Sequence, residues 1–257
     1  MDSWEGYALA GGSALVAGAI NALAGGGTLL TFPALQLVMS PMQANMTSTV
    51  ALFPGSLAGS WGFRQEIIGG KDWLARLLPA SVAGGVLGSF LLIWGSPGHF
   101  DVLVPWLVLT ASVLFIAQPW LGRGQSGQSG PPTWGLVGLA SLVQFAVAVY
   151  GGYFGAGIGI LMLATLGQWG VGGLHRVNGM KNLLASIING ISAIIFSFSG
   201  EVRWDYVLVM GLAAVTGGYL AGRVGPKIPR QWLRNFVICA GVLQTLYYFV
   251  RQVGWTV

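Results

Sequence analysis

Long, unbroken stretches of apolar residues recur from one end of the chain to the other. A helix that crosses the hydrocarbon core of a bilayer needs about 20 such residues. Six stretches meet this requirement: residues 45–63, 74–95, 102–121, 174–199, 204–222 and 231–250. Because the runs are continuous and do not alternate with polar residues, they predict membrane-spanning α-helices and argue against a porin-type barrel.

Two further apolar stretches, residues 6–39 and 133–170, are too long for one span, and each is broken by glycines. The breaks read AGGGT at 24–28 and FGAGIG at 154–159, and each interior glycine costs a helix about 1 kcal/mol relative to alanine. Each pair therefore predicts either two crossings or a hairpin of helices that enters the membrane and returns. The short second arms, 28–39 and 158–169, favour partial penetration.

The same order of elements occurs twice along the chain. The polar, glycine-rich linker 122–132 separates an N-terminal repeat, residues 1–121, from a C-terminal repeat, residues 133–257. AGGGTLLTFPAL aligns with FGAGIGILMLAT, and each break is followed by three long spans. The alternative is chance similarity between apolar segments. The matched order favours two repeats of four elements each, with a glycine-broken helical hairpin in each half.

Charge is scarce, and its placement predicts the topology. Only 7% of the 257 residues are charged, against roughly 25% in an average soluble domain, which excludes an ordinary soluble enzyme. When the segments are threaded through a membrane, nine of the twelve Lys and Arg residues fall on one side, which is the cytoplasmic side by the positive-inside rule. Corresponding loops then face opposite sides, so the repeats are inverted, the linker is cytoplasmic and both termini are extracytoplasmic.

Catalytic and metal-binding groupings are missing from the sequence. The single cysteine, Cys239, excludes an internal disulfide, and it lies on a different segment from His175. All seven acidic residues lie at segment ends or in loops, so no carboxylate inside a span could orient a base or hold a cation. We therefore expect no enzyme, no cofactor and no metal site, and the scattered basic residues predict no nucleic-acid partner.

The glycine breaks are the first candidate binding elements. A helix that begins at a break directs backbone N–H groups at whatever lies before it, and such a terminus suits a small anion. The alternative is close helix packing through small residues, and the matching positions of the two breaks favour a site. The residues concerned are Gly25, Gly26, Gly27, Thr28, Gly155 and Gly157.

Polar residues after the two second arms form the next candidate set. They are Asn45, Thr47, Ser48 and Thr49 in the first half, and Asn178, Lys181, Asn182 and Asn189 in the second. Asn178, Lys181 and Asn182 share one helical face. A lysine inside a membrane span is costly and indicates a functional site, although snorkelling toward the nearby helix end is the alternative. Amides, hydroxyls, a lysine and helix N-termini together suit a small oxyanion.

These motifs resemble the TauE/SafE family of sulfite exporters. The resemblance rests on AGGGTLLTFPAL, on ANMTSTVALFPGSLAGSWGFR and on VNGMKNLLASIINGISAIIFSFSGEVRW, and it extends over both halves. It implies a transporter of the bacterial inner membrane that moves sulfite, organosulfonates or related anions, usually outward. The motif residues are those named above together with Pro33. The second half has Lys181-Asn182 where the first has Ser48-Thr49, so the two halves contribute unequally to the site.

The expected function is that of a secondary transporter exporting a small sulfur-containing oxyanion, sulfite or an organosulfonate, by alternating access. An anion channel and an exporter of small carboxylates are the alternatives, since similar donors serve all of these ligands. The expected partners are the anion, the lipid bilayer and a coupling ion, either H⁺ or Na⁺. The oligomeric state is left open by the sequence.

Overall fold

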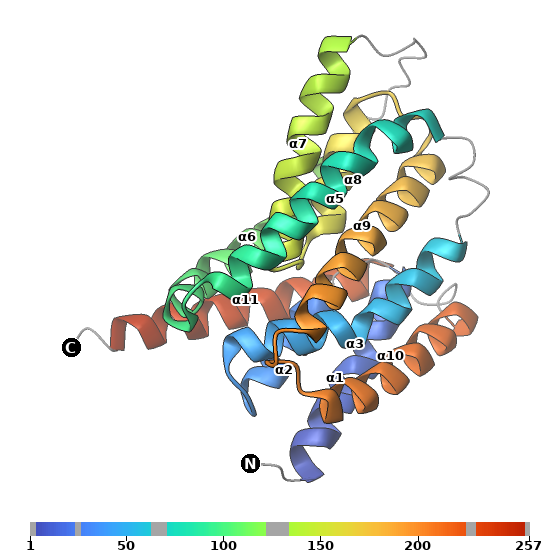
Figure 1. The fold of residues 1–257 in the computed structure, drawn as a ribbon. Coiled ribbons are helices and arrows are strands. Elements are labelled where there is room, and N and C mark those ends of the chain that lie inside the picture. Colours follow the sequence, from blue (N-terminus) through green and yellow to red (C-terminus); the bar gives the residue numbers. More distant parts are fainter. Residues whose placement is uncertain (1–3, 24–26, 63–70, 122–133, 225–229, 255–257) are drawn as a thin grey trace.

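The computed structural model describes residues 4–23, 27–62, 71–121, 134–224 and 230–254. Within these ranges every regular element is an α-helix, which confirms the expected all-α fold. Gly25, Gly26 and the linker 122–132 lie outside the described residues. Figure 1 shows the helices packed side by side as an elongated bundle, with α11 extending to one side.

Each half contributes five of the described helices. The first half holds α1 (Trp4–Leu23), α2 (Thr28–Gln36), α3 (Pro41–Gly62), α5 (Lys71–Trp94) and α6 (Pro97–Leu121). The second half holds α7 (Trp134–Tyr153), α8 (Ile158–Gln168), α9 (Leu174–Ser197), α10 (Trp204–Val224) and α11 (Arg230–Gly254).

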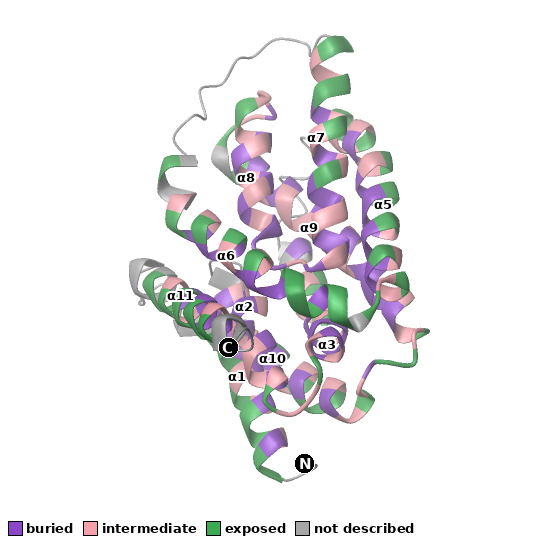
Figure 2. Ribbon diagram, turned by 90° about the vertical axis from the view of Figure 1, so that its left-hand side faces the viewer, coloured by how far each residue is buried: buried purple, intermediate pink, exposed green. Residues whose placement is uncertain are grey.

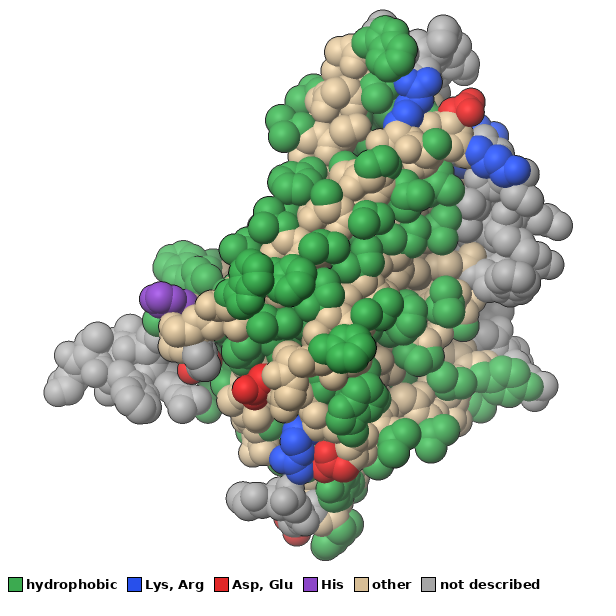
Figure 3. All heavy atoms as spheres, viewed as in Figure 1, with side chains coloured by type: hydrophobic (Ala, Val, Ile, Leu, Met, Phe, Trp, Pro, Cys, Tyr) green, Lys and Arg blue, Asp and Glu red, His purple; other side chains and the backbone are tan. Residues whose placement is uncertain are grey.

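The outer surface matches a membrane environment. Four described helices are long and apolar enough to cross a bilayer, namely Lys71–Trp94, Gly98–Ala117, Trp134–Tyr153 and His175–Ser197. In Figure 3, hydrophobic side chains cover the middle of the visible face, while charged side chains gather toward its upper and lower ends. Because exposed apolar surface on this scale is stable only in lipid, the chain is a multi-pass membrane protein.

The two glycine breaks produce two short helices. α2 has 9 residues and α8 has 11, so neither is long enough to span a bilayer alone. Gly155 and Gly157 have φ values of 80° and 79°, in the left-handed region that glycine enters without a steric penalty. Gly157 is the residue that caps the N-terminus of α8, so the backbone turn before this helix depends on glycine.

The helices of the two halves correspond in spacing and in packing partners. α7 and α8 begin 130 residues after α1 and α2, and the last three helices of the second half begin 133 residues after α3, α5 and α6. The most extensive contacts join α1 to α10 and α5 to α7, while α3 packs on α9 and α6 on α11. In Figure 1, α1 begins at the lower end of the molecule and its equivalent α7 at the upper end.

Glycines allow both of the closest helix pairs to form. A side-chain carbon on Gly18 would collide with the carbonyl of Ala214 on α10, and one on Gly152 would collide with the carbonyl of Gly85 on α5. Backbones this close require small residues at the crossing. Figure 2 shows the result, with buried faces turned toward the neighbouring helices and exposed faces turned outward.

Candidate functional site

A cavity of about 500 Å³ lies between the two halves, and helices of both halves line it. Four of its lining residues carry nitrogen-containing side chains: Asn21, Lys181, Asn182 and Asn189. Hydroxyl groups come from Thr28, Thr49, Ser56, Ser186 and Tyr219. Of the sequence-predicted residues, the structure therefore brings Thr28, Thr49, Gly155, Gly157, Lys181, Asn182 and Asn189 together.

Lys181 is the one charged side chain among the described residues that line the cavity. Its alkyl chain lies over the first turn of α8, where a methyl group on Gly159 would lie 3.5 Å from Lys181 Cδ. It forms no hydrogen bond or ion pair with any described residue. Because no Asp or Glu is found among the described lining residues, the cavity has an uncompensated positive charge at this wall.

The two short helices add further positive character. Thr28 is the first residue of α2, and Ile158 is the first residue of α8. Both residues line the cavity, together with Gly157 and Gly159. The N-terminal end of a helix has a partial positive charge and free backbone N–H groups. Two such ends and a lysine around one cavity favour an anionic ligand.

Amide side chains continue this polar wall along α9. Asn182 follows Lys181 directly, and the Asn189 Oδ1 atom lies 3.8 Å from where a side-chain carbon on Gly155 would stand. Neither amide side chain is hydrogen-bonded to a described residue. Both can therefore donate to a ligand oxygen without first breaking a bond within the protein.

Thr47 and Ser48 do not reach the cavity in this structure. The Thr47 hydroxyl accepts a hydrogen bond of 3.2 Å from the backbone N–H of Arg203, and Ser48 Oγ lies 2.6 Å from Thr31 Oγ1 on α2. Both side chains are fully buried. The Ser48 hydroxyl therefore joins α3 to α2, and the Thr47 hydroxyl joins α3 to the segment before α10.

Three other predicted residues also lie outside the lining. The Asn45 Nδ2 atom donates to the backbone carbonyl of Tyr153, at 3.0 Å, next to the second glycine break. Asn178 does not line the cavity and has an interaction of its own. Gly27 is buried at the start of α2. The contacts of Asn45 and Gly27 support the elements around the cavity.

Asn21 is a lining residue that the sequence reasoning missed. It lies near the C-terminal end of α1, and its Oδ1 atom accepts a hydrogen bond of 2.7 Å from the Gly27 backbone N–H. The sequence does carry a signal for this residue, because Asn21 is an amide in an otherwise apolar helix end, six residues before Gly27.

Some residues of the cavity lining are also exposed. These include Ala58 and Tyr219, which lie toward the C-terminal ends of α3 and α10. The side chain of Tyr219 is 58% exposed.

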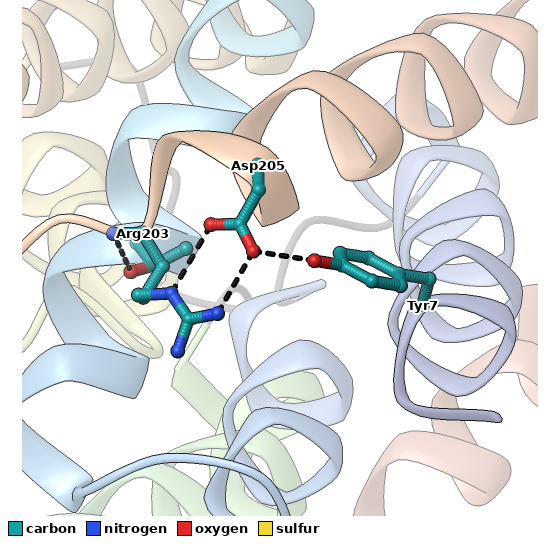
Figure 4. A network of polar contacts seen from close by, with 4 residues as sticks. Tyr7, Arg203 and Asp205 are labelled. Atoms are coloured by element: carbon teal, nitrogen blue, oxygen red, sulfur yellow. Dashed lines mark hydrogen bonds and ion pairs between the residues drawn. The ribbon is translucent and has the colours of Figure 1, made fainter. Parts of the chain in front are cut away.

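The N-terminal ends of α1 and α10 are joined by a polar network, drawn in Figure 4. Tyr7 donates a hydrogen bond to Asp205 Oδ2 at 2.7 Å, and the Arg203 guanidinium reaches both Asp205 oxygens at 3.1 and 2.9 Å. The Arg203 backbone is bonded to Thr47 on α3. The network thus joins α1, α3 and the start of α10.

Metal binding has no support in the described part of the chain. No three His, Cys, Asp or Glu side chains lie together there in a way that could hold an ion. The described cavity lining carries one positively charged side chain, Lys181, and no acidic one, which suits an anion better than a cation.

Comparison with known proteins yields one family and several relatives. The family described as Sulfite exporter TauE/SafE matches residues 10–248. A probable membrane transporter protein of Haemophilus influenzae is 28% identical, over 93% of this chain and 92% of its own length. The probable membrane transporter protein YfcA of Escherichia coli K12 is 28% identical over 84% and 77%, and the protein ORF9 of Sinorhizobium is 29% identical over 84% and 80%. No solved structure gives a significant match.

Proposed function

The chain belongs to the sulfite exporter TauE/SafE family, and we propose that it is a secondary transporter that exports a small sulfur-containing oxyanion by alternating access. The observation that carries this proposal is the cavity, where Lys181 and the N-terminal ends of α2 and α8 meet without an acidic side chain among the described lining residues. Helix N-termini and a lysine are suitable groups for binding an anion near the middle of a membrane.

The organisation of the two halves supports alternating access. The equivalent helices α1 and α7 begin at opposite ends of the molecule (Figure 1), as expected for the inverted repeats of secondary transporters. The exposed lining residues Ala58 and Tyr219 lie toward the C-terminal ends of α3 and α10, and from their position we infer that the cavity opens there. The Tyr7–Arg203–Asp205 network joins the N-terminal ends of α1 and α10. With the positive-inside orientation, this conformation faces the cytoplasm of a cell with the protein in its inner membrane.

The size and walls of the cavity favour an organosulfonate over sulfite itself. A volume of about 500 Å³ exceeds by far the roughly 30 Å³ that one water molecule occupies in the liquid, so the cavity has room for more than a four-atom anion. Leu52, Phe154 and Leu163 provide apolar wall on the same cavity. An alkyl sulfonate would place its charged oxygens near Lys181 and its carbon chain against these side chains.

The direct test measures binding of three anions to the purified protein by thermal shift. We expect ethanesulfonate to raise the melting temperature at lower concentration than sulfite, and sulfite at lower concentration than propionate. Tighter binding of propionate would favour the small-carboxylate alternative. Absence of any shift with all three anions, in protein that melts cooperatively, would contradict the proposed substrate class.

A further inference from the structure

Resting on the proposed function, we propose that Asn21 is both a positioning residue and a substrate-binding residue. Its carbonyl oxygen holds the start of α2 in place, while its NH₂ group donates a hydrogen bond to the transported oxyanion. The side chain thus connects the geometry of the first glycine break to recognition of the substrate.

The hydrogen bond to Gly27 determines which way the amide faces. The backbone N–H of Gly27 donates to Asn21 Oδ1 at 2.7 Å, and a backbone N–H can only donate, so the acceptor must be the amide oxygen. The NH₂ group is then left with two hydrogens and forms no hydrogen bond with any described residue. Since Asn21 lines the cavity, these hydrogens are available to a ligand there.

Close contact between α1 and Gly27 fixes the side chain in position. A methyl group on Gly27 would lie 3.0 Å from Asn21 Cγ and 2.5 Å from the Ala17 carbonyl oxygen. Such a contact is tighter than ordinary van der Waals packing, so the backbone of Gly27 lies directly against the last turns of α1. A donor held this rigidly loses little conformational freedom when a ligand binds.

The second glycine break shows that an amide at this position is not required to build such a turn. The residue equivalent to Asn21 is Gly151, which lies 130 residues later. There the turn is held by Tyr150, whose hydroxyl donates to the Ala156 carbonyl at 2.6 Å. Asn21 therefore adds a hydrogen-bond donor facing the cavity at the first break, whereas the equivalent Gly151 has no side chain to do so.

Asn21 also completes the set of donors around the anion. Asn21 and Thr28 line the cavity from the first half of the chain, and Lys181 and Asn182 line it from the second. A sulfonate has three oxygen atoms that accept hydrogen bonds, so one ligand can bind to donors of both halves. The first half, which has no charged residue among the described lining, then contributes through Asn21 and the N-terminus of α2.

The substitution Asn21→Asp separates the two roles. A carboxylate oxygen still accepts from the Gly27 N–H, but the NH₂ donor is replaced by a negatively charged oxygen facing the substrate. We expect this variant to melt within a few degrees of the wild type and to bind ethanesulfonate at least tenfold more weakly at pH 7. Affinity should partly recover as the pH is lowered, because a protonated carboxyl can donate again, whereas ethanesulfonate remains an anion.

The matched control is Gln168→Glu, the same change of amide to carboxylate at an exposed position at the end of α8. It should leave the affinity for ethanesulfonate unchanged. If Asn21→Asp does not fold, Asn21→Ser replaces it, since a serine hydroxyl is neutral and too short to reach both partners. A weakening of several-fold is then expected.

Two results would overturn this inference, and they are distinguishable from each other. If the wild type binds ethanesulfonate and a folded Asn21 variant binds it equally well at every pH, Asn21 serves only to hold α2. If the wild type itself binds neither ethanesulfonate nor sulfite, the proposed function has failed and the binding role of Asn21 fails with it.

Discussion

The two halves of the chain place equivalent helices against equivalent partners, yet among the described lining residues only the second half presents a charge to the cavity. Lys181 on α9 corresponds to Ser48 on α3, 133 residues earlier. Ser48 is buried against Thr31 of α2, whereas Lys181 lines the cavity over Gly159 of α8. Glycine contacts and apolar packing maintain the repeated architecture, and polar side chains at equivalent positions are free to take different roles.

A second difference concerns the two closest helix pairs. The pair α1 and α10 supplies Gly18, Asn21, Ala214 and Tyr219 to the cavity lining. No described residue of α5 lines it, although α5 and α7 form the equivalent pair. The cavity is therefore displaced toward one pair. If the two halves exchange roles during alternating access, the cavity of the other conformation would lie closer to α5 and α7.

The largest loss of stability is expected at the glycine crossings of the two closest helix pairs, where the halves are alike. Gly18→Val and Gly152→Val each place a branched side chain against the backbone of the partner helix, so each should destabilise the protein by about 3 kcal/mol or more. Yield and melting temperature in detergent would measure this effect. The controls are Gly12→Val in α1 and Gly138→Val in α7, where nothing lies within 4 Å. A large loss of stability in only one of Gly18→Val and Gly152→Val would show that the two helix pairs do not depend on close packing to the same extent.

The second largest effect is a loss of transport, expected at Lys181 and not at its equivalent Ser48. Lys181→Met keeps the alkyl chain over Gly159 and removes the charge, so ethanesulfonate transport into proteoliposomes should fall more than tenfold while the protein stays folded. The equivalent change Ser48→Ala removes one hydrogen bond, to Thr31, at a cost of about 1 kcal/mol in stability. Its transport should stay within about twofold of the wild type. Equal losses in both variants would remove the functional difference between the halves.

The smallest effect is a lower melting temperature, expected when the Tyr7–Arg203–Asp205 network is weakened. Asp205→Asn weakens the contacts with Arg203 and Tyr7, and partly exposed pairs of this kind contribute about 1 kcal/mol or less. The melting temperature should fall by about 2–4 °C. The equivalent residue, Asp72, is exposed and forms no ion pair with a described residue, so Asp72→Asn should change the melting temperature by less than a degree. Similar shifts in the melting temperatures of the Asp205→Asn and Asp72→Asn variants would show that the network does not stabilise this end of the molecule.

Local sequence signals account for the helix starts at the two glycine breaks and for the fold class. Glycine runs mark helix breaks because glycine is a poor helix former, and α2 begins at Thr28 and α8 at Ile158, directly after those runs. The motifs also predicted the family correctly. The continuous apolar runs predicted an all-α membrane fold for the same kind of local reason, since length and hydropathy are properties of each segment alone.

Long-range contacts limited the prediction of the candidate site. Thr47 and Ser48 have the composition of a binding site, but their hydroxyls are engaged by Arg203 and Thr31, and neither partner is apparent from neighbouring sequence. Asn21 was missed for the opposite reason, because its importance comes from a contact across the break to Gly27. The inversion of the repeats and the role of the lining residues remain predictions.

Counterflow of ethanesulfonate in proteoliposomes tests the central claim most directly. Vesicles preloaded with unlabelled ethanesulfonate are diluted into a trace of labelled ethanesulfonate, and the label inside is followed with time. A carrier with one alternately exposed site predicts transient accumulation of label above its equilibrium level in the wild type, and at least tenfold slower accumulation with Lys181→Met. Passive equilibration without overshoot, at the same rate in both proteins, would contradict the account and indicate a channel.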